Sequence, residues 1–178
     1  IMSNRTDLAL ESYESSDKTK IDGVEIKENN NITTVKILNE KGSQALGKPV
    51  GEYITLNVDS FVNNTDIFDG RIELFSKVLW DVLPENIDSV LVAGLGNENI
   101  TADALGPKVN DYVLSTRHIL SNLENNSGFD ELFSVATITT GVLGETGIET
   151  CEIVKGIVDQ LEPSCVIVVD ALAASSTD

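Results

Sequence analysis

The chain has 178 residues, and its 29 Asp and Glu residues outnumber its 12 Lys and Arg residues, so its formal net charge is −17. Its length and its hydrophobic content of 41% are typical of a globular protein with a sizeable core rather than of a disordered chain. The acidic balance argues against direct binding of nucleic acid or of an anionic membrane surface, because their phosphates would be repelled.

The first half of the chain predicts a polar arm followed by a β-hairpin region. Residues 1–20 are polar and show no sustained period, which is typical of a loose N-terminal arm. Short β-like runs, the first two separated by an asparagine-rich turn, predict strands at residues 24–27, 33–38 and 53–58. Apolar residues then repeat at helical spacing from Ile67 to Val82, and Pro84 follows the end of this predicted helix.

From residue 88 onwards the chain repeats a strand–loop–helix pattern. Continuous apolar runs, which predict strands buried on both faces, lie at residues 89–93, 135–138 and 166–169. Helical patterns follow the first two runs, over residues 105–119 and 153–161. The predicted fold is therefore α/β, with a mostly parallel sheet sandwiched by helices and an N-terminal β-hairpin region. We expect residues 21–178 to form a single domain behind the arm.

Carboxylates occupy the loops where a parallel sheet places its sites, beyond the carboxyl ends of the strands. Asp103 lies in the first such loop, Glu145 and Glu149 lie in a glycine-rich second loop, and Asp170 ends the third apolar run. A carboxylate after an apolar strand is poorly solvated, and two such neighbours can share a proton. One can then act as general base on water while the other acts as general acid.

This pairing of Asp103 with Asp170 requires that their two strands are neighbours. The alternative is structural. Asp170 would then accept backbone N–H bonds at a strand end or cap a helix, and Asp103 would be an ordinary residue of a first helical turn.

Other motifs give weaker indications. The Gly-Leu-Gly at residues 94–96 begins like a dinucleotide fingerprint, but its sixth position is Asn99, so nucleotide binding is not favoured. Gly144 and Gly147 would let a peptide approach the backbone closely, or they simply form a tight strand-to-helix connection. His118 is the single histidine and favours a structural hydrogen bond. No cofactor and no zinc site are expected, although an acidic site for a harder metal stays open.

The cysteines and the apolar runs bear on location. Cys151 and Cys165 form no CxxC pair and favour reduced core residues, hence a cytoplasmic location. The apolar runs are too short to span a bilayer, and the first residues contain no apolar signal core. No membrane association is therefore expected.

Six blocks of the sequence, taken in order, resemble the germination protease family of spore-forming bacteria. The blocks are residues 5–9 (RTDLA), 94–97 (GLGN), 101–107 (TADALGP), 116–118 (TRH), 144–150 (GETGIET) and 170–174 (DALAA). The resemblance implies an atypical aspartic endopeptidase that degrades small acid-soluble spore proteins during germination, with Asp103 and Asp170 as its two catalytic aspartates. It also implies a fold similar to that of hydrogenase-maturation peptidases and a homotetramer in the spore core.

The resemblance further implies a zymogen that loses a short N-terminal segment, with the scissile bond between Asp7 and Leu8. Three positions depart from the family pattern: Ala102 and Thr140 stand where proline is usual, and Ser175 stands where arginine is usual. Family members run much longer than this chain, so we expect the domain to be truncated at its C-terminus.

The leading interpretation is an endopeptidase that uses Asp103 and Asp170 to activate water, with Gly144, Gly147 and Glu149 lining the substrate cleft. One alternative is a metal-assisted peptidase of the hydrogenase-maturation type. A second alternative is an inactive acidic fragment that binds basic or spore-type proteins without cleaving them.

Overall fold

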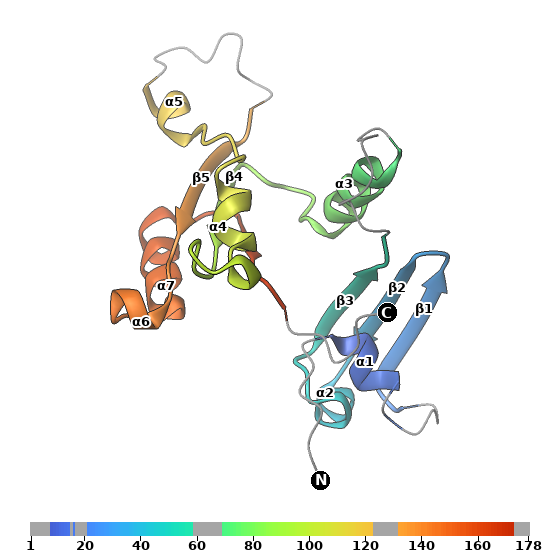
Figure 1. The fold of residues 1–178 in the computed structure, drawn as a ribbon. Helices are drawn as coiled ribbons and strands as arrows, with labels where there is room; N and C mark the ends of the chain where they lie inside the picture. Colours follow the sequence, from blue (N-terminus) through green and yellow to red (C-terminus); the bar gives the residue numbers. More distant parts are fainter. Residues whose placement is uncertain (1–7, 15, 17–20, 59–68, 123–131, 173–178) are drawn as a thin grey trace. The chain divides into compact units, whose positions relative to one another are not determined.

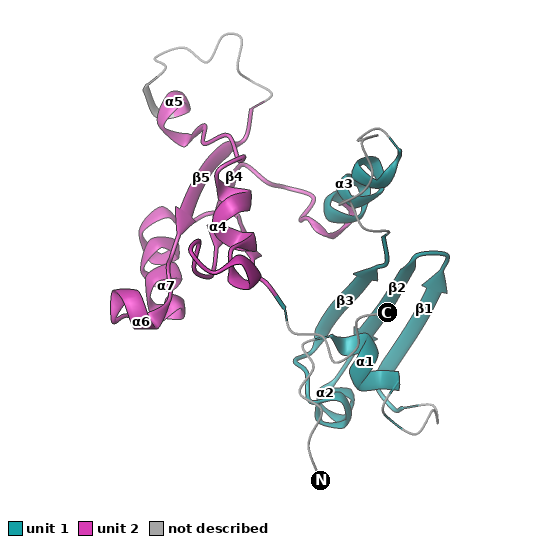
Figure 2. Cartoon of the chain, in the orientation of Figure 1, with its two compact units in different colours: residues 1–80, 172–178 teal, residues 81–171 magenta. Residues whose placement is uncertain are grey.

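The computed structural model describes residues 8–14, 16, 21–58, 69–122 and 132–172, and the chain divides into two compact units. The first unit comprises residues 1–80 with 172–178, and the second comprises residues 81–171 (Figure 2). The predicted fold class is confirmed, because an antiparallel sheet with the N-terminal hairpin precedes a parallel sheet that helices flank. The division into an arm and one domain from residue 21 stays a prediction.

The first unit is built on an antiparallel sheet in the order β1-β2-β3 (Figure 1). Its elements are α1 (Ala9–Glu14), β1 (Val24–Asn29), β2 (Ile32–Ile37), α2 (Glu40–Leu46), β3 (Gly51–Leu56) and α3 (Arg71–Val82), the last of which crosses into the second unit. The register sets Val35 opposite Ile26 on one side and opposite Tyr53 on the other. Asn30 turns the hairpin with a φ of 49°, a conformation that asparagine tolerates. The predicted hairpin and third strand are thus confirmed.

The core of the first unit forms on one face of β2, because alternate side chains of a strand point to the same face. Val35 and Ile37 of β2 are buried, and Ala9 of α1 and Leu46 of α2 complete the same cluster. The sequence pattern does not predict α1 or α2, because helices of 6 and 7 residues are too short to display a helical repeat.

The predicted processing bond lies just ahead of α1. Asp7 lies outside the described residues. The carbonyl of Leu8 accepts a hydrogen bond from Ser12 N–H at 3.2 Å, so Leu8 begins the hydrogen bonding of α1.

The second unit is a parallel α/β sheet in the order β5-β4-β6. Its elements are β4 (Ser89–Gly94), the 3₁₀ turn η1 (Thr101–Asp103), α4 (Leu105–Asn110), α5 (Arg117–Asn122), β5 (Ser134–Thr139), α6 (Leu143–Thr146), α7 (Thr150–Leu161) and β6 (Cys165–Val169). The central strand β4 carries the buried core residues Leu91, Val92 and Ala93. Both parallel ladders end together, with Gly94 opposite Thr139 of β5 and opposite Val169 of β6.

The single helix predicted over residues 105–119 is wrong, because the chain forms two short helices, α4 and α5, separated by a turn. Thr116 explains the break. Its N–H donates to Val135 O at 3.0 Å, its hydroxyl accepts from Val135 N–H at 2.9 Å and donates to Phe133 O. A helix that ran through Thr116 would bond its N–H to a carbonyl of the preceding turn instead of to Val135 O, so the bonds to the start of β5 favour the turn.

Candidate active site

The carboxyl edge of the parallel sheet brings together the three loops in which the sequence places its carboxylates. Leu95 N–H, just past β4, donates to Val169 O at 2.8 Å, and Thr140 N–H, just past β5, donates to Gly94 O at 3.2 Å. The strands that precede Asp103 and Asp170 are therefore hydrogen-bonded neighbours. The condition that the sequence sets for their pairing is met.

Asp103 is half-buried and is held by the start of its own loop. Its Oδ2 accepts a hydrogen bond from Asn97 N–H at 2.9 Å, and its N–H donates to Ile100 O at 2.8 Å. The N-cap of α4 is Ala104, which makes no side-chain capping bond. The Asp103 carboxylate is thus bonded to the glycine-containing loop that precedes it.

Gly106 packs the beginning of α4 directly onto the sheet edge. A Cβ at this position would lie 2.4 Å from both Leu95 O and Val169 O, and 2.5 Å from Leu95 N. Leu95 directly follows β4, whereas Val169 ends β6 and immediately precedes Asp170. The absence of a side chain at Gly106 therefore allows the Asp103 loop to close over the end of β6.

Asp170 differs from expectation, because its side chain is exposed rather than poorly solvated. Within the described residues, β6 pairs only with β4, and Val168 of β6 is itself 52% exposed. Asp170 Oδ1 accepts from the N–H of Ala171 at 2.8 Å, which is the structural bond that the alternative interpretation predicts. The structure thus places the two aspartate-bearing loops side by side, and each carboxylate is bonded to a main-chain N–H.

The glycine-rich loop after β5 contains the short helix α6 between two left-handed glycines. Gly141 and Gly147 have φ values of 67° and 71°. A Cβ at Gly144, inside α6, would meet nothing within 4 Å, so the backbone there is open to approach. Glu149 is the N-cap of α7, and its N–H donates to Glu152 Oε2 at 3.3 Å. Its cleft-lining role stays a prediction.

Sequence reasoning missed the residue that connects two of these loops, Asn97. Its Nδ2 donates to Glu145 Oε1 at 2.6 Å, and Asn97 is buried. Glu145 and not Glu149 is thus the carboxylate of the glycine-rich loop that is joined to the Asp103 loop. The sequence feature that could have indicated Asn97 is a polar residue directly after the Gly-x-Gly that ends a buried strand.

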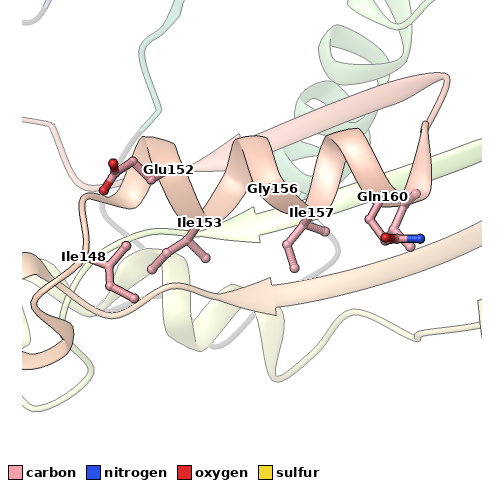
Figure 3. A pocket seen from close by; sticks show the side chains of 7 residues that line it. Ile148, Glu152, Ile153, Gly156, Ile157 and Gln160 are labelled. Atoms are coloured by element: carbon pink, nitrogen blue, oxygen red, sulfur yellow. The ribbon is translucent and has the colours of Figure 1, made fainter.

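An apolar groove of about 700 Å³ runs along α7, beginning just after the glycine-rich loop. The side chains of Ile148, Ile153 and Ile157, which line this groove, lie on the same side of α7 (Figure 3). The predicted cleft residues Gly144, Gly147 and Glu149 are not part of its lining.

In the described part of the chain, no group of three or more His, Cys, Asp and Glu side chains could hold a metal ion. Cys151 and Cys165 are free thiols, but the prediction of core residues is wrong for Cys151, which is exposed at the start of α7. His118 is exposed near the start of α5. No helix within the described ranges has the length and apolar composition that crossing a membrane requires.

Comparison with known proteins gives a consistent result. The family model described as germination protease matches residues 3–178. A germination protease of Caldanaerobacter subterraneus subsp. tengcongensis is 45% identical over 98% of this chain and 55% of its own length. Those of Clostridium tetani and Bacillus cytotoxicus are 41% and 38% identical, over 97% and 98% of this chain and 56% and 51% of their own lengths. The chain spans about half the length of the curated relatives it matches.

Proposed function

The chain belongs to the germination protease family, and we therefore propose that the protein is an endopeptidase that acts during spore germination. Its proposed substrates are small acid-soluble spore proteins, which it would degrade inside the spore core. Support comes from the family match over residues 3–178 and from relatives that carry the germination protease name. The strongly acidic chain suits a protein substrate that has been released from DNA better than one that is still bound to it.

The observation that carries the proposed mechanism is the direct pairing of β4 with β6. The loop of Asp103 and the residue Asp170 both follow these paired strands, and the close packing of Gly106 of α4 against Val169 of β6 supports their proximity. Two carboxyl groups at one sheet edge can divide the acid and base work of peptide hydrolysis between them.

In this mechanism, one carboxylate of the pair Asp103 and Asp170 takes a proton from a water molecule. The water oxygen attacks the peptide carbonyl carbon, and the other carboxyl group donates its proton to the leaving nitrogen as the C–N bond breaks. The proton given to the nitrogen leaves with the amine product, and the proton taken from water then moves to the carboxylate that donated, which restores the starting distribution. Gly144 and Gly147 would leave room for the substrate backbone, and Glu149 would line the same cleft.

The test is cleavage of a purified small acid-soluble spore protein by the complete protein, followed by mass spectrometry. Wild type, Asp103→Asn and Asp170→Asn are compared, each with and without a chelator. Asp159→Asn, on the exposed face of α7, is the matched control because it makes the same chemical change away from the sheet edge.

We expect discrete products with wild type and Asp159→Asn, and a loss of cleavage with Asp103→Asn and with Asp170→Asn. Full activity of either site variant would show that the chemistry lies on other residues. Loss of wild-type cleavage on chelation, restored by added metal, would replace this mechanism with a metal-assisted one. Binding of the substrate without cleavage by wild type would support an inactive binding protein instead.

Two further properties belong to the proposal. Activation would cleave the bond between Asp7 and Leu8, and intact-mass analysis would then show the loss of residues 1–7. The active form would be a homotetramer, which sedimentation equilibrium can measure. An unchanged mass after activation would contradict cleavage between Asp7 and Leu8. A monomer at working concentration would contradict the homotetramer.

A further inference from the structure

Asn97 joins two loops of the candidate active site with bonds from different parts of the same residue. Its main-chain N–H donates to Asp103 Oδ2 at 2.9 Å, and its side-chain Nδ2 donates to Glu145 Oε1 at 2.6 Å. Asn97 is only 8% exposed, whereas Glu145 is an exposed residue of α6. One buried residue therefore connects the loop after β4 with the loop after β5.

A third bond fixes the orientation of the Asn97 amide. Asn99 N–H donates to Asn97 Oδ1 at 2.8 Å, and a main-chain N–H cannot accept in return. Oδ1 must therefore face Asn99, which leaves Nδ2 facing Glu145. Because an amide nitrogen only donates, Glu145 Oε1 is the acceptor, and the bond gains charge-assisted strength when this carboxylate is ionised.

The main chain of the same loop forms the surface against which Asp103 packs. Gly96 has a φ of 112°, and a Cβ there would lie 2.1 Å from Asp103 O and 3.1 Å from Asp103 Cγ. Only glycine permits this approach. Because the Asp103 carboxylate is bonded to the next residue, Asn97, a displacement of Asn97 would displace the carboxylate too.

We propose that Asn97 is a positioning residue for the Asp103 carboxylate, and that Glu145 is its anchor in the glycine-rich loop. This role rests on the proposed function, in which Asp103 acts on water or on the leaving nitrogen. The Asn97–Glu145 bond holds the loop after β4 against the loop after β5. Loss of the bond loosens the Asp103 carboxylate while both members of the aspartate pair stay in the chain.

The test compares single variants with a double variant that rebuilds the bond in the opposite direction. The single variants of the complete protein are Asn97→Asp and Glu145→Gln, and the double variant combines them. In the double variant the amide at position 145 donates to the carboxylate at position 97, and the net charge equals that of wild type. Asn57→Asp is the matched control, because Asn57 is exposed just past β3 in the first unit.

We expect kcat for spore-protein cleavage to fall by about 10- to 100-fold in Asn97→Asp with little change in KM, the size of a lost charge-assisted bond. Glu145→Gln keeps an acceptor oxygen for Asn97 and should lower kcat by less. The double variant should return kcat to within about threefold of wild type, because its bond is re-formed. Asn57→Asp should behave as wild type.

Two results would overturn the positioning role. One is wild-type kcat in Asn97→Asp, measured in a preparation whose cleavage is lost in Asp103→Asn. The other is a double variant that is no better than Asn97→Asp although its urea unfolding midpoint equals that of wild type. A wild-type protein that cleaves no spore protein, or an active Asp103→Asn, would instead overturn the proposed function on which the role depends.

Discussion

Replacement of Gly106 by alanine should separate the two strand ends that carry the aspartate loops. The added Cβ would lie 2.4 Å from Leu95 O and from Val169 O, whereas ordinary contacts begin at 3.4 Å. The difference, 3.4 − 2.4, means that about 1.0 Å of space must open on both sides at once. Both neighbours are backbone atoms at the ends of paired strands, so neither can rotate away as a side chain could.

Overpacking of this kind typically costs 1–3 kcal/mol, and we expect about 3 kcal/mol here because no flexible group yields. With a urea m-value of about 2 kcal/mol/M, the unfolding midpoint would fall by about 1.5 M. Circular dichroism can follow this transition, and faster hydrogen exchange of Leu95 N–H would report the opened strand end, because this group donates to Val169 O.

Gly156→Ala is the control for this prediction. Gly156 also lies inside a helix, α7, but its Cβ would meet nothing within 4 Å, so alanine should stabilise by about 0.5–1 kcal/mol through helix propensity. If Gly106→Ala matched Gly156→Ala in urea midpoint and left Leu95 exchange unchanged, the argument from close approach would be refuted.

Two further predictions concern local hydrogen bonds. Asn39 caps α2 by accepting from Gly42 N–H at 3.1 Å, so Asn39→Ala should cost about 1 kcal/mol in urea unfolding, and Asn39→Asp should cost much less. Hydrogen bonding by the Ser164 hydroxyl, followed by that of the Ser89 hydroxyl, lowers the pKa of Asp88 below its ordinary value of 3.8. The ionised carboxylate therefore stabilises the fold at pH values above its pKa in the unfolded chain. This stabilisation is lost as the pH falls through the lower pKa of the folded state. Ser164→Ala should raise the pKa of Asp88, which NMR titration of its carboxyl group measures; an unchanged titration would contradict the assignment.

The sequence predicts the strands of the second unit well because each contains a continuous apolar run, although only β4 of the three contains fully buried residues and the burial on both faces expected of all three is wrong for β6. The apolar runs at 89–93, 135–138 and 166–169 all lie within strands of the parallel sheet. The order β5-β4-β6 leaves no comparable mark, since the runs are alike in composition and any of them could be central. The sequence alone therefore could not predict that the strands before Asp103 and Asp170 are neighbours.

Side-chain bonds between loops are harder still to predict. Asn97 and Glu145 are 48 positions apart, and each is locally unremarkable, because asparagine after glycine is common in turns and glutamate is common at helix starts. The helix break at Thr116 has the same origin, since a hydroxyl bonded to the start of β5 decides it and not the apolar spacing of residues 105–119. A local sequence pattern fails to predict the structure where a long-range hydrogen bond stabilises a different conformation.

The exposure of Asp170 follows from the position of its strand and not from the residues beside it. Two neighbouring strands flank β4, and its Leu91 and Ala93 are buried. Their register partners in β6, Val166 and Val168, are 37% and 52% exposed, although they point to the same face of the sheet. An apolar run thus indicates how much burial a strand can accept, while the elements packed around the strand set how much it receives. The solvation of a carboxylate at the strand's end depends on the second quantity, which the run itself does not encode.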